Sequence, residues 1–277
     1  MAVLTALRQS PGALLRNPVL FVPILALMIV QFPILLLQSV NPLLASVASA
    51  ALSLVFVAAI PFVQGGLFAM AEEALGGRTA LATFVAAGKQ HYVAILIAYL
   101  VLVAVNFVFG MLGFAASIAG GVLFIGSGGF QSANLAALAV IGVVAAVALL
   151  AYLLIVFFVQ FYGQAIVLED RDAVDGLKRS VGVVRGNLLS TFGYTVLAGV
   201  VGGLLGSVFA VSSFVLTPST TSSPAMGPEM AAAAPQTSAS IAGLAGVTAL
   251  IVVLGTLFGG FFTVFSVSFY REITGPP

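Results

Sequence analysis

The sequence contains no cysteine, which excludes disulfide bonds, thiolate catalysis and metal sites built from cysteine. Charge is also scarce. Only 6% of the 277 residues are Asp, Glu, Lys or Arg, whereas about a quarter is typical of soluble globular proteins. The formal net charge of +1 gives no strong attraction to nucleic acid, so no nucleic-acid partner is expected. The single histidine, His91, lacks the sequence neighbours that would favour a catalytic role.

Hydrophobic residues are abundant instead, at 61% of the chain with a mean hydropathy of +1.24. A helix needs roughly 20 apolar residues to cross the hydrocarbon core of a bilayer, and six segments reach that length. These segments lie at about residues 18–40, 44–70, 92–118, 133–168, 190–216 and 240–270. They leave no room for a separate water-soluble core. The sequence therefore predicts an all-α bundle of six transmembrane helices that forms one membrane domain over residues 1–277.

The cations of the chain are distributed unevenly between the predicted sides of the membrane. If the six segments cross alternately, all nine basic residues fall on one side: Arg8, Arg16, Arg78, Lys89, Arg171, Lys178, Arg179, Arg185 and Arg271. Basic loops stay in the cytoplasm, so we expect both termini to be cytoplasmic in a multi-pass protein of the cell membrane. The opposite side receives only Glu229, in a Ser-, Thr- and Pro-rich segment at 217–239 that we expect to be a flexible external loop.

The two internal loops on the basic side show helical amphipathicity. In the second loop an apolar stripe faces away from the charged residues, and it consists of Val174, Leu177, Val181, Val184 and Leu188. The first loop has a similar stripe near residues 81–92. Such helices lie in the membrane interface with their cations near anionic headgroups. The predicted interface for lipid or a partner therefore comprises Arg78, Lys89, Arg171, Lys178, Arg179 and Arg185.

A shift of ninety-six residues aligns the two loop regions with each other. It places Phe62-Val63-Gln64 on Phe158-Val159-Gln160, Glu73 on Glu169, and Lys89 on Arg185. This match predicts a parallel pseudo-two-fold repeat that relates predicted helices 2 and 3 to helices 4 and 5.

Four stretches of sequence together resemble a family signature: residues 164–170 (Gln-Ala-Ile-Val-Leu-Glu-Asp), 175–180 (Asp-Gly-Leu-Lys-Arg-Ser), 185–187 (Arg-Gly-Asn) and 16–18 (Arg-Asn-Pro). The chain resembles six-helix archaeal membrane proteins of unknown function that are related to the membrane domain of glycerophosphodiester phosphodiesterases. The resemblance implies six helices and a membrane location. It implies no phosphodiesterase activity, because in that family the chemistry belongs to a separate soluble domain.

Amides are the notable polar groups within the predicted membrane segments. Gln64, Asn106, Gln160 and Gln164 are candidates for a polar path, and they equally fit hydrogen bonds that hold helices together. The segments contain no ionisable residue away from their ends, which argues against a proton-coupled pump but not against passive conduction.

Acidic residues cluster between the fourth and fifth segments. Glu169, Asp170, Asp172 and Asp175 offer oxygen ligands for a divalent cation, although helix capping and pairing with nearby cations account for them equally well. We therefore expect no metal or cofactor site and no catalytic residues.

The predicted function is that of a non-enzymatic membrane protein that binds lipids or a membrane or cytoplasmic protein partner. The alternative is a permease or channel for a small solute. The sequence leaves the oligomeric state open.

Overall fold

The computed structural model describes residues 2–126, 135–216 and 241–275. All secondary structure in these residues is helical, as the sequence predicts. The predicted external loop at 217–239, with Glu229, lies outside the described residues. The described helices are α1 (Ala2–Arg16), the 3-10 turn η1 (Pro18–Leu20), α2 (Phe21–Val40), α3 (Pro42–Gly76), α4 (Leu81–Gln90), α5 (Tyr92–Gly126), α6 (Leu135–Val159), α7 (Tyr162–Leu168), α8 (Ala173–Gly186), α9 (Leu188–Leu216) and α11 (Ile241–Thr274).

Four stretches are long and apolar enough to cross a membrane: Leu43–Gly76, Tyr92–Ile125, Leu135–Leu168 and Thr248–Thr274. Two more candidates are bent pairs, in which a short helix meets a long one at 94° (α1 with α2) or 103° (α8 with α9). The described chain thus has four to six candidate spans, and the count of six stays a prediction.

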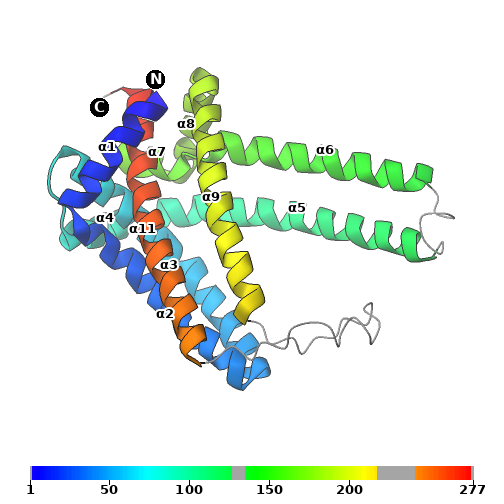
Figure 1. The fold of residues 1–277 in the computed structure, drawn as a ribbon. Coiled ribbons are helices and arrows are strands. Elements are labelled where there is room, and N and C mark those ends of the chain that lie inside the picture. The colour runs from blue at the N-terminus through cyan, green and yellow to red at the C-terminus, as the bar shows by residue number, and fades with distance from the viewer. Residues whose placement is uncertain (1, 127–134, 217–240, 276–277) are drawn as a thin grey trace.

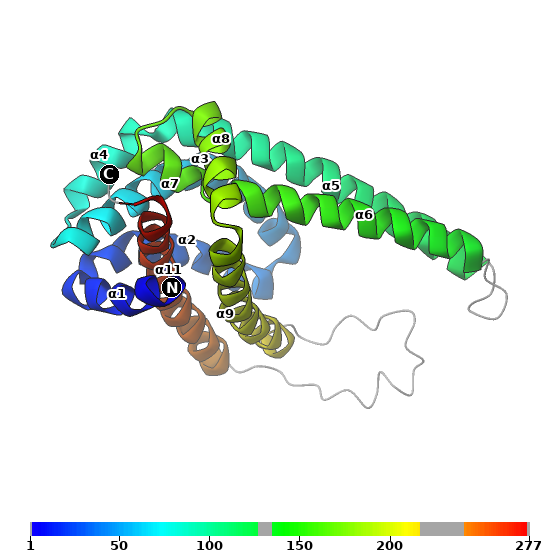
Figure 2. The same ribbon diagram turned by 90° about the horizontal axis from the view of Figure 1, so that it is seen from above.

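The long helices form three hairpins, α2–α3, α5–α6 and α9–α11, which all leave the same end of the molecule (Figure 1). We call that end the base. It contains α1, α4, α7, α8 and the adjoining ends of the long helices. Helix α11 packs against α1, α2 and α3, whereas the α5–α6 hairpin diverges from the other two in both views (Figures 1 and 2).

Helix α1 was not among the predicted amphipathic helices, although it belongs to the base in the same way as α4 and α8. Its buried residues are Ala6, Ser10, Ala13 and Leu14, which follow helical spacing, and this face packs against α11. Arg8 and Arg16 lie on its exposed side.

The predicted segment at 133–168 is two helices rather than one, because α6 ends at Val159 and α7 begins at Tyr162. Ser180 of α8 bridges this break. Its hydroxyl accepts a hydrogen bond from the Phe161 amide (3.1 Å) and donates one to the Phe158 carbonyl (2.9 Å). Ser180 therefore satisfies backbone groups that the interruption of the helix leaves without intrahelical partners.

The core of the base is aromatic. Phe161, Tyr194, Phe265, Phe269 and Tyr270 are all buried, and the rings of Tyr194 and Phe269 stack with centroids 4.7 Å apart. Such pairs contribute about 0.5–1.5 kcal/mol each beyond the burial of their area. The core cluster to which they belong has buried residues from α1, α7, α8, α9 and α11, next to the polar groups described below.

Glycines allow α3 and α4 to approach closely where they cross. A Cβ on Gly66 would lie 2.6 Å from the Phe84 carbonyl oxygen, and one on Gly88 would lie 2.9 Å from the Phe62 carbonyl oxygen. Both distances are shorter than Cβ contacts in proteins allow, so only glycine fits either position at this helix separation.

Candidate functional site

All nine lysines and arginines lie in the base. They occur in α1, α4 and α8, in the linkers that precede α4 and α8, and in the last turn of α11. Every Asp and Glu of the described residues lies at the same end. The base therefore contains every charged side chain of the described residues, and it is the candidate functional site.

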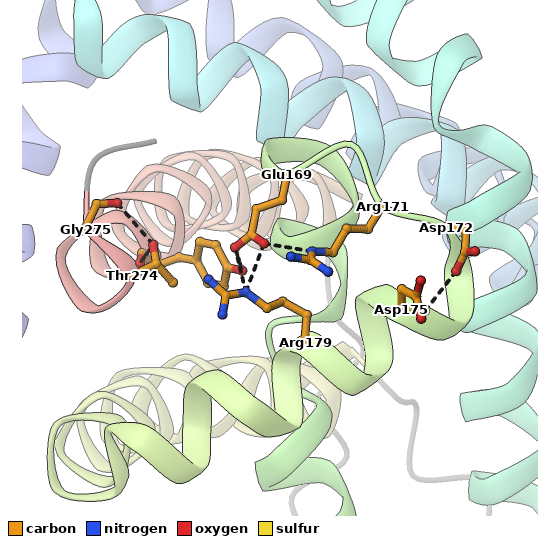
Figure 3. A network of polar contacts seen from close by, with 8 residues as sticks. Glu169, Arg171, Asp172, Asp175, Arg179, Thr274 and Gly275 are labelled. Atoms are coloured by element: carbon orange, nitrogen blue, oxygen red, sulfur yellow. Dashed lines mark hydrogen bonds and ion pairs between the residues drawn. The ribbon is translucent and has the colours of Figure 1, made fainter.

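Glu169, directly after α7, is the most heavily bonded carboxylate in the base (Figure 3). It accepts hydrogen bonds from Arg171 Nε (2.8 Å), Arg179 Nε (2.9 Å to the nearer oxygen) and Tyr270 Oη (2.6 Å). Burial alone would raise the pKa of Glu169, but these three donors outweigh it and hold the pKa below its usual value. Glu169 thus remains ionised and ties α7, α8 and α11 together.

This arrangement divides the six predicted interface cations into two groups. Arg171 and Arg179 are bound to Glu169, and Lys178 Nζ lies 3.4 Å from Asp175 Oδ1. The other three, Arg78, Lys89 and Arg185, are exposed and form no ion pair within the described chain. The guanidinium of Arg185 lies 5.9 Å from the centroid of the Phe158 ring. Half of the predicted set is therefore neutralised internally, as the pairing alternative from the sequence expected for Lys178 and Arg179.

The acidic cluster serves the structure of α8. Asp172 is the N-cap of this helix, and its carboxylate accepts the Asp175 amide hydrogen at 2.8 Å. Glu169 binds arginines, and Asp175 pairs with Lys178. Over the described ranges, no three His, Asp or Glu side chains converge in a way that could hold a metal ion. Of the two alternatives from the sequence, capping and pairing is the one that the contacts support.

Three residues lie where a short helix of the base meets a long helix, and we call them the junction residues: Asn17, His91 and Asn187. Asn17 is 2% exposed, and its amide donates to the carbonyls of Ala13 (3.0 Å) and Gly77 (2.9 Å). Asn187 donates to the carbonyls of Val183 (3.1 Å) and Ile273 (3.3 Å).

The role of the junction residues was not predicted from the sequence, although two of them stand in the motif stretches Arg-Asn-Pro and Arg-Gly-Asn. Their partners are 60 residues away for Asn17 and 86 for Asn187, so no local pattern identifies them.

His91 is the buried junction residue between α4 and α5, with 7% exposure. Its Nδ1 lies 3.7 Å from Oδ1 of Asp170, which also accepts a hydrogen bond from Gln90 (3.5 Å). Burial lowers the pKa of His91 from its ordinary value of 6.5, and the charge of Asp170 opposes this effect without cancelling it. The histidine that lacks neighbours in the sequence thus has a carboxylate beside it in the fold.

Replacing His91 with asparagine, the residue at the other two junctions, should remove a pH dependence of stability. Because the folded-state pKa of His91 is lowered, the unfolded chain binds more protons just below pH 6.5, and acidification through that window destabilises the fold. One proton accounts for at most about 1.4 kcal/mol per pH unit. Thermal midpoints in detergent at pH 7.5 and pH 5.5 should differ more for the wild type than for His91→Asn.

The matched control is Asp170→Asn, which removes the opposing charge and lowers the pKa of His91 further. This variant should lose more stability on acidification than the wild type. If His91→Asn keeps the full pH response of the wild type, the explanation is wrong. Titration of Glu169 does not contribute to this comparison, because its lowered pKa places its titration at more acidic pH.

The four amides of the candidate polar path are held separately. Gln64 Oε1 accepts from Tyr162 Oη at 2.9 Å, Asn106 Oδ1 from Tyr152 Oη at 2.6 Å, and Gln160 Oε1 from Thr195 Oγ1 at 3.2 Å. Gln164 is 4% exposed. Within the described chain no hydrogen bond joins one of these amides to another. Three of them link neighbouring helices, which is the helix-packing role rather than a continuous path.

Two cavities flank Arg271, whose Nη1 lies 3.3 Å from Glu72 Oε1. One, of about 450 Å³, is lined by residues that include Arg16, Arg271 and Glu272, and the other, of about 230 Å³, includes Glu72, Glu169, Arg179 and Arg271. The smaller cavity has two carboxylates and two cations, so its charges balance. The larger has Arg16 and Arg271 against Glu272 alone, an excess of one cation.

A family model matches residues 1–273, and its description is "Domain of unknown function (DUF7847)". The chain belongs to this family. The match includes every described helix except the last residue of α11, Thr274. Curated proteins and solved structures yield no significant match to the chain. The description of the family names no activity, and any function must be argued from the base.

Proposed function

We propose that this member of the family is a non-enzymatic integral membrane protein whose base binds anionic lipid headgroups. One observation carries the proposal. Arg78, Lys89 and Arg185 are exposed, carry no carboxylate partner in the described chain, and lie at the end from which the three hairpins leave.

The physical reason is the depth at which the base would sit. If the hairpins occupy the hydrocarbon, α1, α4 and α8 lie at the interface, where a cation near an anionic surface contributes about 1 kcal/mol. The placement of every basic residue in the base supports a cytoplasmic base with both termini inside, in the cell membrane. A protein partner with an acidic surface is the other candidate for the same cations.

The test uses purified full-length chain in mild detergent and measures binding of phosphatidylglycerol against phosphatidylcholine. The triple variant Arg78→Gln, Lys89→Gln, Arg185→Gln should weaken phosphatidylglycerol binding roughly a hundredfold, since each cation contributes about fivefold. Raising the salt from 50 mM to 500 mM should weaken wild-type binding as well.

The control variant is Lys178→Gln, which removes an exposed cation that is already paired with Asp175. It should change the affinity less than twofold. Equal affinity of the wild type and the triple variant, or no preference for the anionic lipid, would contradict the proposal.

The permease or channel alternative has less support in the contacts, because three of the four candidate amides each bind a hydroxyl on a neighbouring helix. Flux of a solute panel through reconstituted vesicles is its test. The relation to glycerophosphodiester phosphodiesterase membrane domains and the archaeal origin stay predictions from resemblance.

A further inference from the structure

The same local arrangement occurs three times along the chain. A short helix of the base ends at a junction residue and a long helical hairpin follows: α1, Asn17 and α2–α3; α4, His91 and α5–α6; α8, Asn187 and α9–α11. The turns at Asn17 and Asn187 are similar, at 94° and 103°.

Each junction residue also contacts the far end of its own hairpin. The Asn17 amide donates to the carbonyl of Gly77, just after α3. His91 faces Asp170, just after α7. The Asn187 amide donates to the carbonyl of Ile273, at the end of α11. The contact closes each unit at its base. The same contact occurs at the base of all three segments, although the segments differ in length. This recurrence favours an internal structural repeat over coincidence.

The ninety-six-residue correspondence reappears between the end of one unit and the first helix of the next. Glu73 accepts a hydrogen bond from Thr83, and Glu169, ninety-six residues later, accepts one from Arg179.

Similarly, the ring of Phe84 packs on Phe62, while Ser180 donates to the carbonyl of Phe158. The repeat predicted from the sequence therefore relates the boundary between the first and second units to the boundary between the second and third. The first unit begins before this repeat, at α1.

One cation stands just before each junction residue. Arg16 immediately precedes Asn17, Lys89 lies two residues before His91, and Arg185 lies two residues before Asn187. All three are exposed and lack an ion pair within the described chain, unlike Arg171, Lys178, Arg179 and Arg271. Arg8 and Arg78 are also exposed and without an ion pair there, but neither stands just before a junction residue. Arg16 Nε donates to its own helix at Gly12, which leaves its terminal nitrogens for another acceptor.

We propose that the chain consists of three copies of one unit, at residues 2–77, 81–170 and 173–274, and that each copy binds the phosphate of one anionic lipid through Arg16, Lys89 or Arg185. The junction is where each unit enters its hairpin, which is the depth of headgroup phosphates if the hairpins cross the membrane. The inference rests on the proposed function and adds the number of lipids and their positions.

Native mass spectrometry of the full chain with phosphatidylglycerol tests the proposal by counting retained lipids. The wild type should retain three lipids and each of Arg16→Gln, Lys89→Gln and Arg185→Gln two. The variant that carries these three substitutions together should retain none at the three junctions. Lys178→Gln, from the same helix as Arg185, should retain three. Inorganic phosphate at millimolar concentration should not displace the lipids, because the hydrocarbon chains hold them in place.

The possible outcomes separate the two proposals. If Lys178→Gln loses as many lipids as Arg185→Gln, anionic lipid binding stands and the assignment of one lipid to each unit fails. If the wild type shows no preference for phosphatidylglycerol over phosphatidylcholine, both fail. Displacement by phosphate would indicate sites for a free anion and would overturn the lipid assignment. Thermal midpoints within about 2 °C of the wild type establish that the variants fold.

Discussion

Replacing Gly66 with alanine should destabilise the protein by about 3 kcal/mol, the upper part of the usual range for overpacked sites. The new Cβ would lie 2.6 Å from the carbonyl oxygen of Phe84, and a backbone atom cannot move aside as a flexible side chain can. Relief of the clash requires α4 to separate from α3, which also breaks the Phe62–Phe84 ring contact. The thermal midpoint in detergent should fall clearly.

Gly76→Ala is the control, because it lies on the same helix and a Cβ there meets no atom within 4 Å. This substitution should leave the midpoint unchanged or raise it, since alanine is the better helix former. If Gly66→Ala and Gly76→Ala behave alike, the close crossing of α3 and α4 is not as the structure describes it. Gly88→Ala, on the other side of the crossing, should reproduce the loss.

Replacing Glu169 with glutamine should cost about 2 kcal/mol, the next largest effect. The change removes the charge that Arg171 and Arg179 share and the strong acceptor for the Tyr270 hydroxyl, 101 residues away along the chain. Loss of one member of a fully buried ion pair costs about 3–5 kcal/mol. The side chains here are between 22% and 39% exposed, so solvent reduces the effect.

The Glu169 network also has a pH signature. Since the folded-state pKa of Glu169 is lowered, its contribution is complete above the unfolded-state value near 4.5 and is lost as the pH falls toward the folded-state value. The wild type should therefore lose stability below about pH 4.5 more steeply than Glu169→Gln. Asp175→Asn, which breaks an exposed pair with Lys178, should cost less than about 0.5 kcal/mol. Equal losses for the two variants would show that the network is not structural.

Patterns along the chain predicted most of the secondary structure, with errors at the helix ends. The predicted segments 44–70 and 92–118 correspond to α3 (Pro42–Gly76) and α5 (Tyr92–Gly126), which both continue further. The length of an apolar run indicates which part of a helix hydrocarbon could surround. The helix itself continues beyond that run for as long as its backbone hydrogen bonds are satisfied. The break between α6 and α7 has no such signal, because Ser180, which stabilises it, lies on another helix.

The candidate site was predicted in part. The sequence predicted a helix at α8, and Asp172 is its N-cap. Of the predicted apolar stripe, however, only Val184 is buried, because the face that packs on the base is Ala173, Gly176, Ser180, Val183 and Val184. Pairing of Arg179 with the acidic cluster was one of two alternatives from the sequence, but its partner Glu169 and the pairing of Arg271 with Glu72 on a different helix were not predicted. Ion pairing depends on distances between side chains, and spacing in sequence gives these only within a helix.

The composition and the helical periodicity of the sequence predicted an all-α chain with long apolar helices and one charged end. Both the transfer of apolar residues from water to lipid and the helical periodicity depend on local sequence. The tertiary structure alone decided which charges remain available and that three junctions close three hairpins. Those properties arise from contacts between residues such as Asn17 and Gly77, or His91 and Asp170, which only the fold brings together.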